Sequence, residues 1–314
     1  MHVAEAVLAQ NPLWIVDVGA SGGIDPRWGT FLGLSYRGVL FEPDPREYDR
    51  LKSASGAQLL VVNAALGDAV TTVTFHLCRK QQVSSVYPPN VSFLRQFPNA
   101  ERFDVINCLR LRTDTLDRQL RMHGVTEVDF IKLDTQGSEL IILQGAVDSL
   151  QTALGLEIEV EFAPLYIGQP LFSDIDSYLR CRGFVLCDLK RGYWKRAEIG
   201  PASRQKGQLV FGDALYLRPP EAVLAMSPAK IVRGICVYLA YGYADLAHVL
   251  FRQAQDRFTP EVRARVKLLL QKSERRALLP NFRGKGRVRW VLERLHAIFE
   301  DNAWHAADSE LGNR

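Results

Sequence analysis

Two acidic side chains stand at the ends of neighbouring apolar runs, each next to a turn. Asp17 lies in Leu13–Val18, directly before a glycine-rich turn that includes Gly19 and Gly23, and Glu42 ends the next run 25 residues later. Glycines let the backbone turn tightly and approach a ligand closely at the carboxyl edge of a sheet. A carboxylate at the end of the second strand can accept hydrogen bonds from both hydroxyls of a ribose. The pair therefore predicts a site for a nucleoside ligand.

The residues around the turn distinguish two kinds of nucleoside cofactor. A dinucleotide fingerprint requires G-x-G-x-x-G, and Ser21 stands where the second glycine would be. The carboxylate of Asp17 would repel a pyrophosphate, whereas it suits the ammonium group of a methionine moiety. We therefore favour S-adenosylmethionine, and a nicotinamide dinucleotide is the alternative.

Short apolar runs alternate with helical patterns through the first two thirds of the chain, which predicts an α/β sheet. The predicted strands of this sheet are Leu13–Val18, Tyr36–Glu42, Leu59–Asn63, Val128–Asp134, Leu154–Phe162, Phe184–Leu189 and Leu209–Leu217. The predicted helices are Pro45–Ser53, Asp114–His123, Ser138–Leu150 and Asp174–Arg182. Two further β segments, Val73–Leu77 and Val105–Leu111, are expected to form a separate pair.

Several motifs in this order resemble the FkbM family of S-adenosylmethionine-dependent methyltransferases, over roughly residues 12–217. The motif that matches best runs from Val128 to Leu140 and contains Lys132-Leu133-Asp134-Thr135-Gln136-Gly137. The other matching segments are Asp17–Ala20, Phe41–Pro45, Asn63–Asp68, Thr113–Asp117, Leu143–Ala146, Glu161–Tyr166 and Gly183-Phe184. Ser21 departs from the family pattern, which often has Asn there, and so does the segment from Gly22 to Trp28, whose Pro26 shortens or bends the first helix.

The resemblance implies a Rossmann-like class I methyltransferase fold, whose seven-stranded sheet is parallel except for its last strand. It implies transfer of a methyl group to a hydroxyl of a sugar, a glycan or a polyketide-like acceptor. By the family's pattern, the cofactor-binding residues are Asp17, Gly19, Ala20 and Gly23 at the methionine end, Glu42 at the ribose, Asn63 and Ala64 beside the adenine, and Asp134 beside the sulfonium.

Methyl transfer to a hydroxyl needs positioning and a group that accepts the hydroxyl proton. The candidate bases are Asp134, Glu139, Glu159, Glu161, His76 and His123. Asp134 is the first choice because it ends a buried strand at the ligand edge, although it could instead bind the cofactor or cap the next helix. Glu161 is the second, because it lies nearest that edge among three glutamates on one strand face. Ser84 and Ser85 could reach the acceptor, although a plain turn is the simpler interpretation.

The composition is that of a globular protein: 47% of its 314 residues are apolar and 24% are charged. The five cysteines form no C-x-x-C pair, which indicates reduced thiols in a cytoplasmic protein and no zinc site. No His/Cys cluster suggests a metal, although a magnesium ion at Asp134 stays open. The N-terminus lacks the pattern of a signal peptide, and the apolar stretch Ile231–Phe251 is expected to be a buried helix.

The segment Arg218-Pro219-Pro220 predicts a boundary, because two prolines cannot continue a central strand. We therefore expect a methyltransferase domain of residues 1–220 and a basic, all-helical extension of residues 221–314. The extension holds 16 basic and 10 acidic residues. The alternative to an enzyme is a binding module whose basic helices, with Trp290, Trp304, Tyr238, Tyr241 and Tyr243, dock an anionic polymer or a membrane surface. A nucleic-acid partner is not expected, peripheral membrane contact stays open, and the sequence does not determine the oligomeric state.

Overall fold

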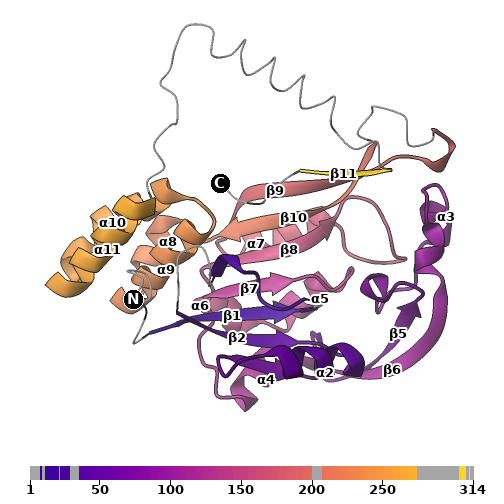
Figure 1. Ribbon diagram of the computed structural model, residues 1–314, viewed down its shortest axis with the longest axis horizontal. Coiled ribbons are helices and arrows are strands. Elements are labelled where there is room, and N and C mark those ends of the chain that lie inside the picture. Colours follow the sequence, from indigo (N-terminus) through magenta and orange to yellow (C-terminus); the bar gives the residue numbers. More distant parts are fainter. Residues whose placement is uncertain are drawn as a thin grey trace, which may run out of the picture.

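A mostly parallel sheet forms the centre of the protein (Figure 1). The computed structural model describes residues 8, 11–20, 22–28, 35–199, 207–273, 304–308 and 311. The strand order is β11-β9-β10-β8-β7-β1-β2-β3. The bounds are β1 Leu13–Val18, β2 Tyr36–Phe41, β3 Leu59–Val62, β7 Phe130–Leu133, β8 Gly155–Glu161, β9 Val185–Trp194, β10 Gln208–Leu217 and β11 His305–Ala307.

The sheet has the class I methyltransferase arrangement that the sequence predicted. Strands β3, β2, β1, β7 and β8 are parallel neighbours, and β10 inserts antiparallel between β8 and β9. One strand was not predicted: β11 pairs antiparallel with β9, so that His305 lies opposite Trp194. The expectation that residues 221–314 are entirely helical is therefore wrong for this short segment.

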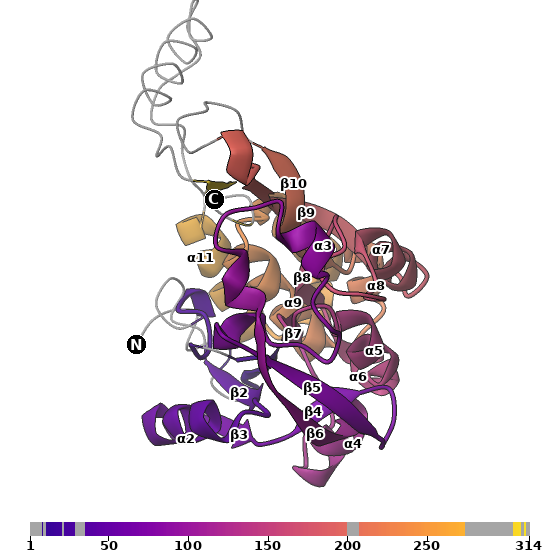
Figure 2. The ribbon, with the colours of Figure 1, turned by 90° about the vertical axis from the view of Figure 1, so that its right-hand side faces the viewer.

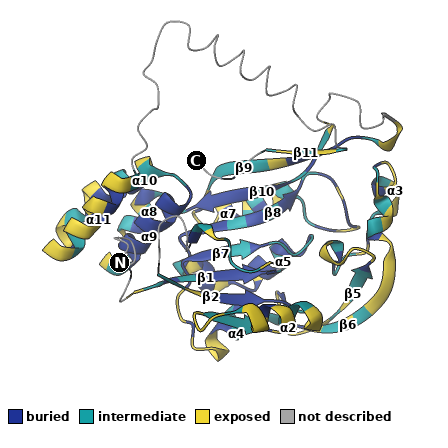
Figure 3. Ribbon diagram, viewed as in Figure 1, coloured by how far each residue is buried: buried dark blue, intermediate teal, exposed yellow. Residues whose placement is uncertain are grey.

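Helices cover both faces of the sheet. On one face lie α4 (Leu116–Met122), α5 (Glu139–Gln144), α6 (Val147–Thr152) and α7 (Phe172–Arg180), which bury alternate residues of the strands. The other face is covered by α2 (Pro45–Ala54) and by the C-terminal helices. These are α8 (Pro220–Leu224), α9 (Pro228–Ala240), α10 (Ala244–Ala254) and α11 (Pro260–Ser273). Figure 3 shows the buried strands between the two layers, with exposed residues on the outer sides of the helices.

The C-terminal helices share a core with the sheet. In α9, every residue from Lys230 to Ala240 is buried, and Tyr238 and Tyr241 pack with sheet residues such as Phe130. The Nζ of Lys230 lies 2.6 Å from Asp129 Oδ1, and Asp129 Oδ2 accepts a hydrogen bond from the backbone N–H of Trp14 at 2.8 Å. The apolar stretch Ile231–Phe251 is therefore largely buried, as expected, but it forms two helices, α9 and α10, and the ion pair of Lys230 with Asp129 attaches α9 to the sheet.

A second, three-stranded sheet lies beyond the carboxyl ends of the main strands, with β5 and β6 at the right of Figure 1. It consists of β4 (Ala65–Gly67), β6 (Val105–Thr115) and β5 (Thr72–Cys78), in that order. The antiparallel pairing of β5 with β6 confirms the predicted β pair. The segment between these strands contains the 3-10 helix η2 (Gln81–Val83), the helix α3 (Val91–Leu94) and the 3-10 helix η3 (Ala100–Phe103). Figure 2 shows this segment crossing in front of the strand ends.

The predicted helix of residues 138–150 is two helices, α5 and α6. The break lies at Gly145, where a Cβ atom would stand 2.1 Å from the carbonyl oxygen of Gly67. Asp117 caps the second helix, because its carboxylate accepts hydrogen bonds from the backbone N–H groups of Asp148 and Ser149 at 2.8 and 2.9 Å. The close approach of two backbones and this tertiary cap interrupt the apolar periodicity that predicted one helix.

Candidate functional site

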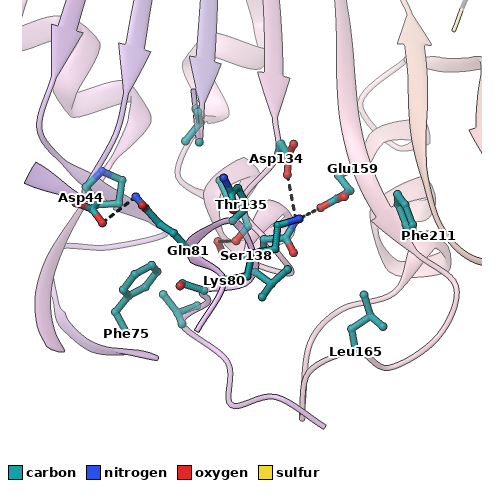
Figure 4. A pocket seen from close by; sticks show the side chains of 18 of the residues that line it. Asp44, Phe75, Lys80, Gln81, Asp134, Thr135, Ser138, Glu159, Leu165 and Phe211 are labelled. Carbon is teal, nitrogen blue, oxygen red and sulfur yellow. Dashed lines mark hydrogen bonds between the residues drawn. The ribbon is translucent and has the colours of Figure 1, made fainter. Parts of the chain in front are cut away.

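A cavity of about 610 Å³ opens at the carboxyl ends of β1, β2, β7 and β8 (Figure 4). This is the edge where open α/β sheets bind their ligands. Its walls come from the strand ends, from the segment between β5 and β6, and from β9, β10 and β11. Four of the predicted cofactor-binding residues line it: Gly19, Glu42, Ala64 and Asp134.

Gly19 is required where β1 meets β7. Its φ of 77° lies in the left-handed region, and a Cβ atom there would stand 2.0 Å from the carbonyl oxygen of Asp134. Only glycine allows this approach. The turn therefore leaves bare backbone at the cavity wall next to the carboxylate of Asp134.

Glu42 follows β2, and its side chain lines the cavity. One oxygen, Oε1, accepts a hydrogen bond from the backbone N–H of Asp44 at 2.9 Å. Burial raises the pKa of Glu42 to about 7, an effect that this hydrogen bond opposes. Asn63 supports the same loop, because its Nδ2 donates to the backbone carbonyls of Glu42 and Pro43 at 2.9 and 3.3 Å.

Asp17 does not share the cavity with Glu42. Its side chain points to the sheet face beside Lys132, 1% of the residue is exposed, and it is not among the residues that line the cavity. Its Oδ1 has no hydrogen-bond partner among the described residues, and burial raises its pKa to about 7. The expectation that both carboxylates face one crevice is therefore not met. Ser21, which belongs to the same turn, lies outside the described residues.

Two other predicted cofactor residues also lie outside the cavity wall. Ala20 is buried with Leu40 and Leu51, and Gly23 has a left-handed φ of 84° and donates its backbone N–H to the carbonyl of Ala20 at 3.0 Å. The exposed Asn63 acts on the Glu42 loop through its amide. Any role of these three residues in cofactor binding stays a prediction.

Gln136 joins two carboxyl groups of the cavity, Asp134 and Glu159, which are labelled in Figure 4. Its Nε2 donates to Asp134 Oδ1 at 3.2 Å and to Glu159 Oε2, while its Oε1 accepts from the hydroxyl of Tyr166 at 3.0 Å. The backbone of Gln136 is left-handed, with a φ of 58°, which is uncommon outside glycine and often marks a functional turn. Burial and the neighbouring Asp134 raise the pKa of Glu159 well above its ordinary value.

Glu139 holds this loop in shape. It is fully buried, and it accepts hydrogen bonds from the backbone N–H groups of Thr135 and Gly137 at 2.7 and 2.9 Å. Burial raises its pKa to about 7. A carboxyl group that is occupied by backbone donors on both oxygens is a structural element of the loop, and it is not available to a substrate.

The remaining candidate bases lie away from the cavity. Glu161 is 1% exposed, neither of its oxygens has a hydrogen-bond partner among the described residues, and burial raises its pKa well above the ordinary value. His76, on β5, lies beside Cys108, and His123 is exposed at the end of α4. On this strand face the structure places Glu159 in the cavity, where the sequence favoured Glu161.

The segment from Lys80 to Ser85 crosses the cavity and is attached at three points. Gln81 Nε2 donates to Asp44 Oδ2 at 2.9 Å, the hydroxyl of Tyr166 donates to Val83 O at 2.9 Å, and Ser85 Oγ donates to Gln136 O at 2.7 Å. Ser84 lines the cavity, whereas Ser85 supports the Gln136 turn. Nothing in the local sequence indicated these attachments, because each joins residues at least 30 positions apart.

No three His, Cys, Asp or Glu side chains in the described parts of the chain lie close enough to hold a metal ion. None of the described helices is long and apolar enough to cross a membrane.

The fold and the cavity at the strand ends are those of a class I methyltransferase, and the comparisons with known proteins agree. The methyltransferase FkbM domain matches residues 17–186, more than half of the chain, so the protein belongs to the FkbM methyltransferase family. Among curated proteins, the 2-O-methyltransferase NoeI of Sinorhizobium fredii is 28% identical over 173 residues, which are 52% of this chain and 69% of NoeI.

Solved methyltransferase structures resemble the chain only distantly. One is the 1,6-didemethyltoxoflavin-N1-methyltransferase of Burkholderia thailandensis, with 14% identity and a TM-score of 0.31 over 69% of this chain and 75% of that one. Another is Sp1610 of Streptococcus pneumoniae, a putative tRNA (m1A22) methyltransferase, with 11% identity and a TM-score of 0.32 over 86% and 96%. At these TM-scores the likeness adds nothing to the family match.

Proposed function

We propose that this methyltransferase uses S-adenosylmethionine to methylate a hydroxyl group of a saccharide-containing acceptor. The observation that carries the proposal is the position of Glu42 in the cavity wall at the end of β2, on the same wall as the bare backbone of Gly19. A partly buried carboxylate with one oxygen free of backbone donors suits the two hydroxyls of a ribose. The name of the relative NoeI, a 2-O-methyltransferase, supports oxygen as the methylated atom.

The residues present fit this cofactor at one more point, to which Asp17 does not contribute, because its carboxylate is buried on the sheet face outside the cavity. Ala64, after β3, lines the cavity on the side of Glu42 that the adenine would occupy. When bound, S-adenosylmethionine supplies an electrophilic methyl group on a sulfonium ion.

The chain's own contribution to the reaction is orientation and removal of one proton. We assign Asp134 as the group that accepts the hydroxyl proton, since its carboxylate lines the cavity at the end of β7. Gln136 fixes that carboxylate through its amide, and burial together with Asp134 raises the pKa of the neighbouring Glu159 well above its ordinary value. A single positioned base typically contributes about 10²–10⁴-fold to the rate.

Calorimetric titration with S-adenosylhomocysteine tests this proposal directly. The wild type should bind, Glu42→Ala should lose most of the affinity, and Asp49→Asn, an exposed change on α2, should bind like the wild type. If Glu42→Ala and the wild type bind equally, or if neither binds, the proposal is refuted. Mass analysis of glycan precursors after incubation with labelled S-adenosylmethionine would then identify the acceptor.

A further inference from the structure

The end of the cavity beside β9, β10 and β11, across the sheet from Glu42, is built around one guanidinium group. The Cζ of Arg102 lies 4.9, 4.7 and 4.6 Å from the ring centroids of Phe103, Trp194 and Trp304. All four side chains line the cavity, and they come from η3, from β9 and from the residue before β11. Aromatic rings contact the flat faces of a guanidinium, so its N–H edge is left for hydrogen bonds.

This edge has no acceptor in the described parts of the chain. Nε of Arg102 is buried without a hydrogen-bond partner, and no carboxylate of the described residues forms an ion pair with the guanidinium. Burial lowers the pKa of Arg102, which reflects the cost of keeping the charge away from water. Because a half-buried guanidinium that lacks a protein acceptor has lost part of its hydration, its place in a cavity wall points to an acceptor that arrives with a ligand.

A second cation stands beside Arg102. The backbone N–H of Lys80 donates to the carbonyl of Arg102 at 3.0 Å, and the Lys80 side chain lines the same cavity (Figure 4). The preceding Arg79, by contrast, is paired with Asp104 at 3.3 Å. Of the three neighbouring cations, the two that line the cavity are therefore the ones without an acidic partner among the described residues.

The cationic wall belongs to the same cavity as Asp134. The ring of Phe103 lies 6.0 Å from the ring of Tyr166, centroid to centroid, and the Tyr166 hydroxyl donates to Gln136, which holds Asp134. One molecule in the cavity can therefore contact Arg102 and present a hydroxyl to Asp134.

We propose that Arg102 and Lys80 bind an anionic group of the methyl acceptor, a carboxylate or a phosphate ester. This inference rests on the methyltransferase function proposed above. Either oxyanion can accept hydrogen bonds from the two Nη groups of Arg102 together, in the two-bonded geometry that guanidinium groups favour. Lys80 supplies a second positive charge at the mouth of the cavity, and the rings of Trp194 and Phe211 can pack against the apolar face of the acceptor.

Calorimetry on the protein saturated with S-adenosylhomocysteine tests the proposal with three probes: D-glucuronate, D-glucose 6-phosphate and neutral D-glucose. At least one anionic probe should bind ten times more tightly than glucose. The anionic probe that binds more tightly shows whether the site prefers a carboxylate or a phosphate. Arg102→Gln should abolish this preference and Lys80→Gln should reduce it several-fold. Arg110→Gln, an exposed change on β6, is the matched control and should keep the preference.

Two results would overturn the inference: equal affinity for all three probes in the wild type, or an unchanged preference in both Arg102→Gln and Lys80→Gln. If Arg102→Gln does not fold, two other variants test the inference. They are Lys80→Gln, at an exposed position, and Arg102→Lys, which keeps the positive charge but loses the two-bonded geometry of the guanidinium. Anion binding should also change the tryptophan emission, because Trp194 and Trp304 contact Arg102. Failure of S-adenosylhomocysteine to bind would refute the proposed function, whereas its binding without an anion preference would refute this inference alone.

Discussion

The affinity for S-adenosylhomocysteine should depend on the charge of Glu42. Its pKa is about 7 in the free protein because the group is buried. Two ribose hydroxyls donate to the carboxylate better than to the neutral acid, so binding lowers this pKa and proton loss favours binding. The affinity should therefore rise with pH through neutrality.

The size of the effect follows from the thermodynamic linkage between protonation of Glu42 and ligand binding. If the pKa of the complex is well below 6, protonation of the free protein weakens binding about tenfold between pH 8 and pH 6. Replacing the carboxylate by an amide, in Glu42→Gln, removes one acceptor and the charge on the other. Hydrogen bonds to charged groups contribute about 1.5–3 kcal/mol each, so a loss of about 3 kcal/mol, on the order of a hundredfold in affinity, is expected.

Calorimetric titrations at pH 6, 7 and 8 with the wild type, Glu42→Gln and Asp49→Asn measure both quantities. Glu42→Gln should lose most of this pH dependence, and Asp49→Asn should follow the wild type. The reasoning fails if Glu42→Gln has the same pH dependence as the wild type, or if its affinity at pH 8 is within twofold of the wild-type affinity.

Three further predictions concern single positions. Gly19→Ala should weaken S-adenosylhomocysteine binding more than tenfold, because its Cβ would strike the Asp134 carbonyl, while Gly124→Ala, equally left-handed but in open space, should bind normally in the same titration. Lys230→Met should lower the free energy of unfolding in urea by about 1.5–3 kcal/mol, because it removes the closer of two cations from the buried carboxylate of Asp129, which keeps Arg233 Nε at 3.4 Å; a loss under 1 kcal/mol would contradict the anchoring role of this pair. The pKa of Glu139 is raised to about 7, so the folded state binds a proton that the unfolded state releases near pH 4.5, and stability should fall as pH rises from 5 to 7; Glu139→Gln should flatten that part of the urea-midpoint curve, and an unchanged slope would show that the cause lies elsewhere.

Much of the fold was predictable from periodicity. The strand Leu13–Val18 and the helix from Pro45 have the expected bounds to within a residue, because the apolar run and the Asp44 cap are local signals. The pairing of β5 with β6 was also visible as two β segments. By contrast, the break between α5 and α6 depends on a contact with Gly67, which no local pattern records.

The candidate site was predictable only on the side of the first two strands and β7. Glu42 and Asp134 end strands whose carboxyl ends must meet at one edge, so their places in the cavity follow from topology. Asp17 was misplaced because it is one residue short of the strand end, where alternation turns its side chain to the sheet face. Arg102 was not found, and Trp304 was considered only on a docking surface of the extension, since the two meet only through the tertiary fold.

The two ends of the cavity are made by stretches of chain that have no strand in common. Gly19 and Glu42 directly follow β1 and β2, whereas Trp194 and Phe211 lie in β9 and β10 and Trp304 directly precedes β11. Substitutions that alter the choice of acceptor can therefore accumulate at the β9–β11 margin of the sheet. The opposite margin, at β1 and β2, would bind the methyl donor and can remain unchanged. Replacement of β11 together with its flanking residues is the smallest such change that this architecture permits.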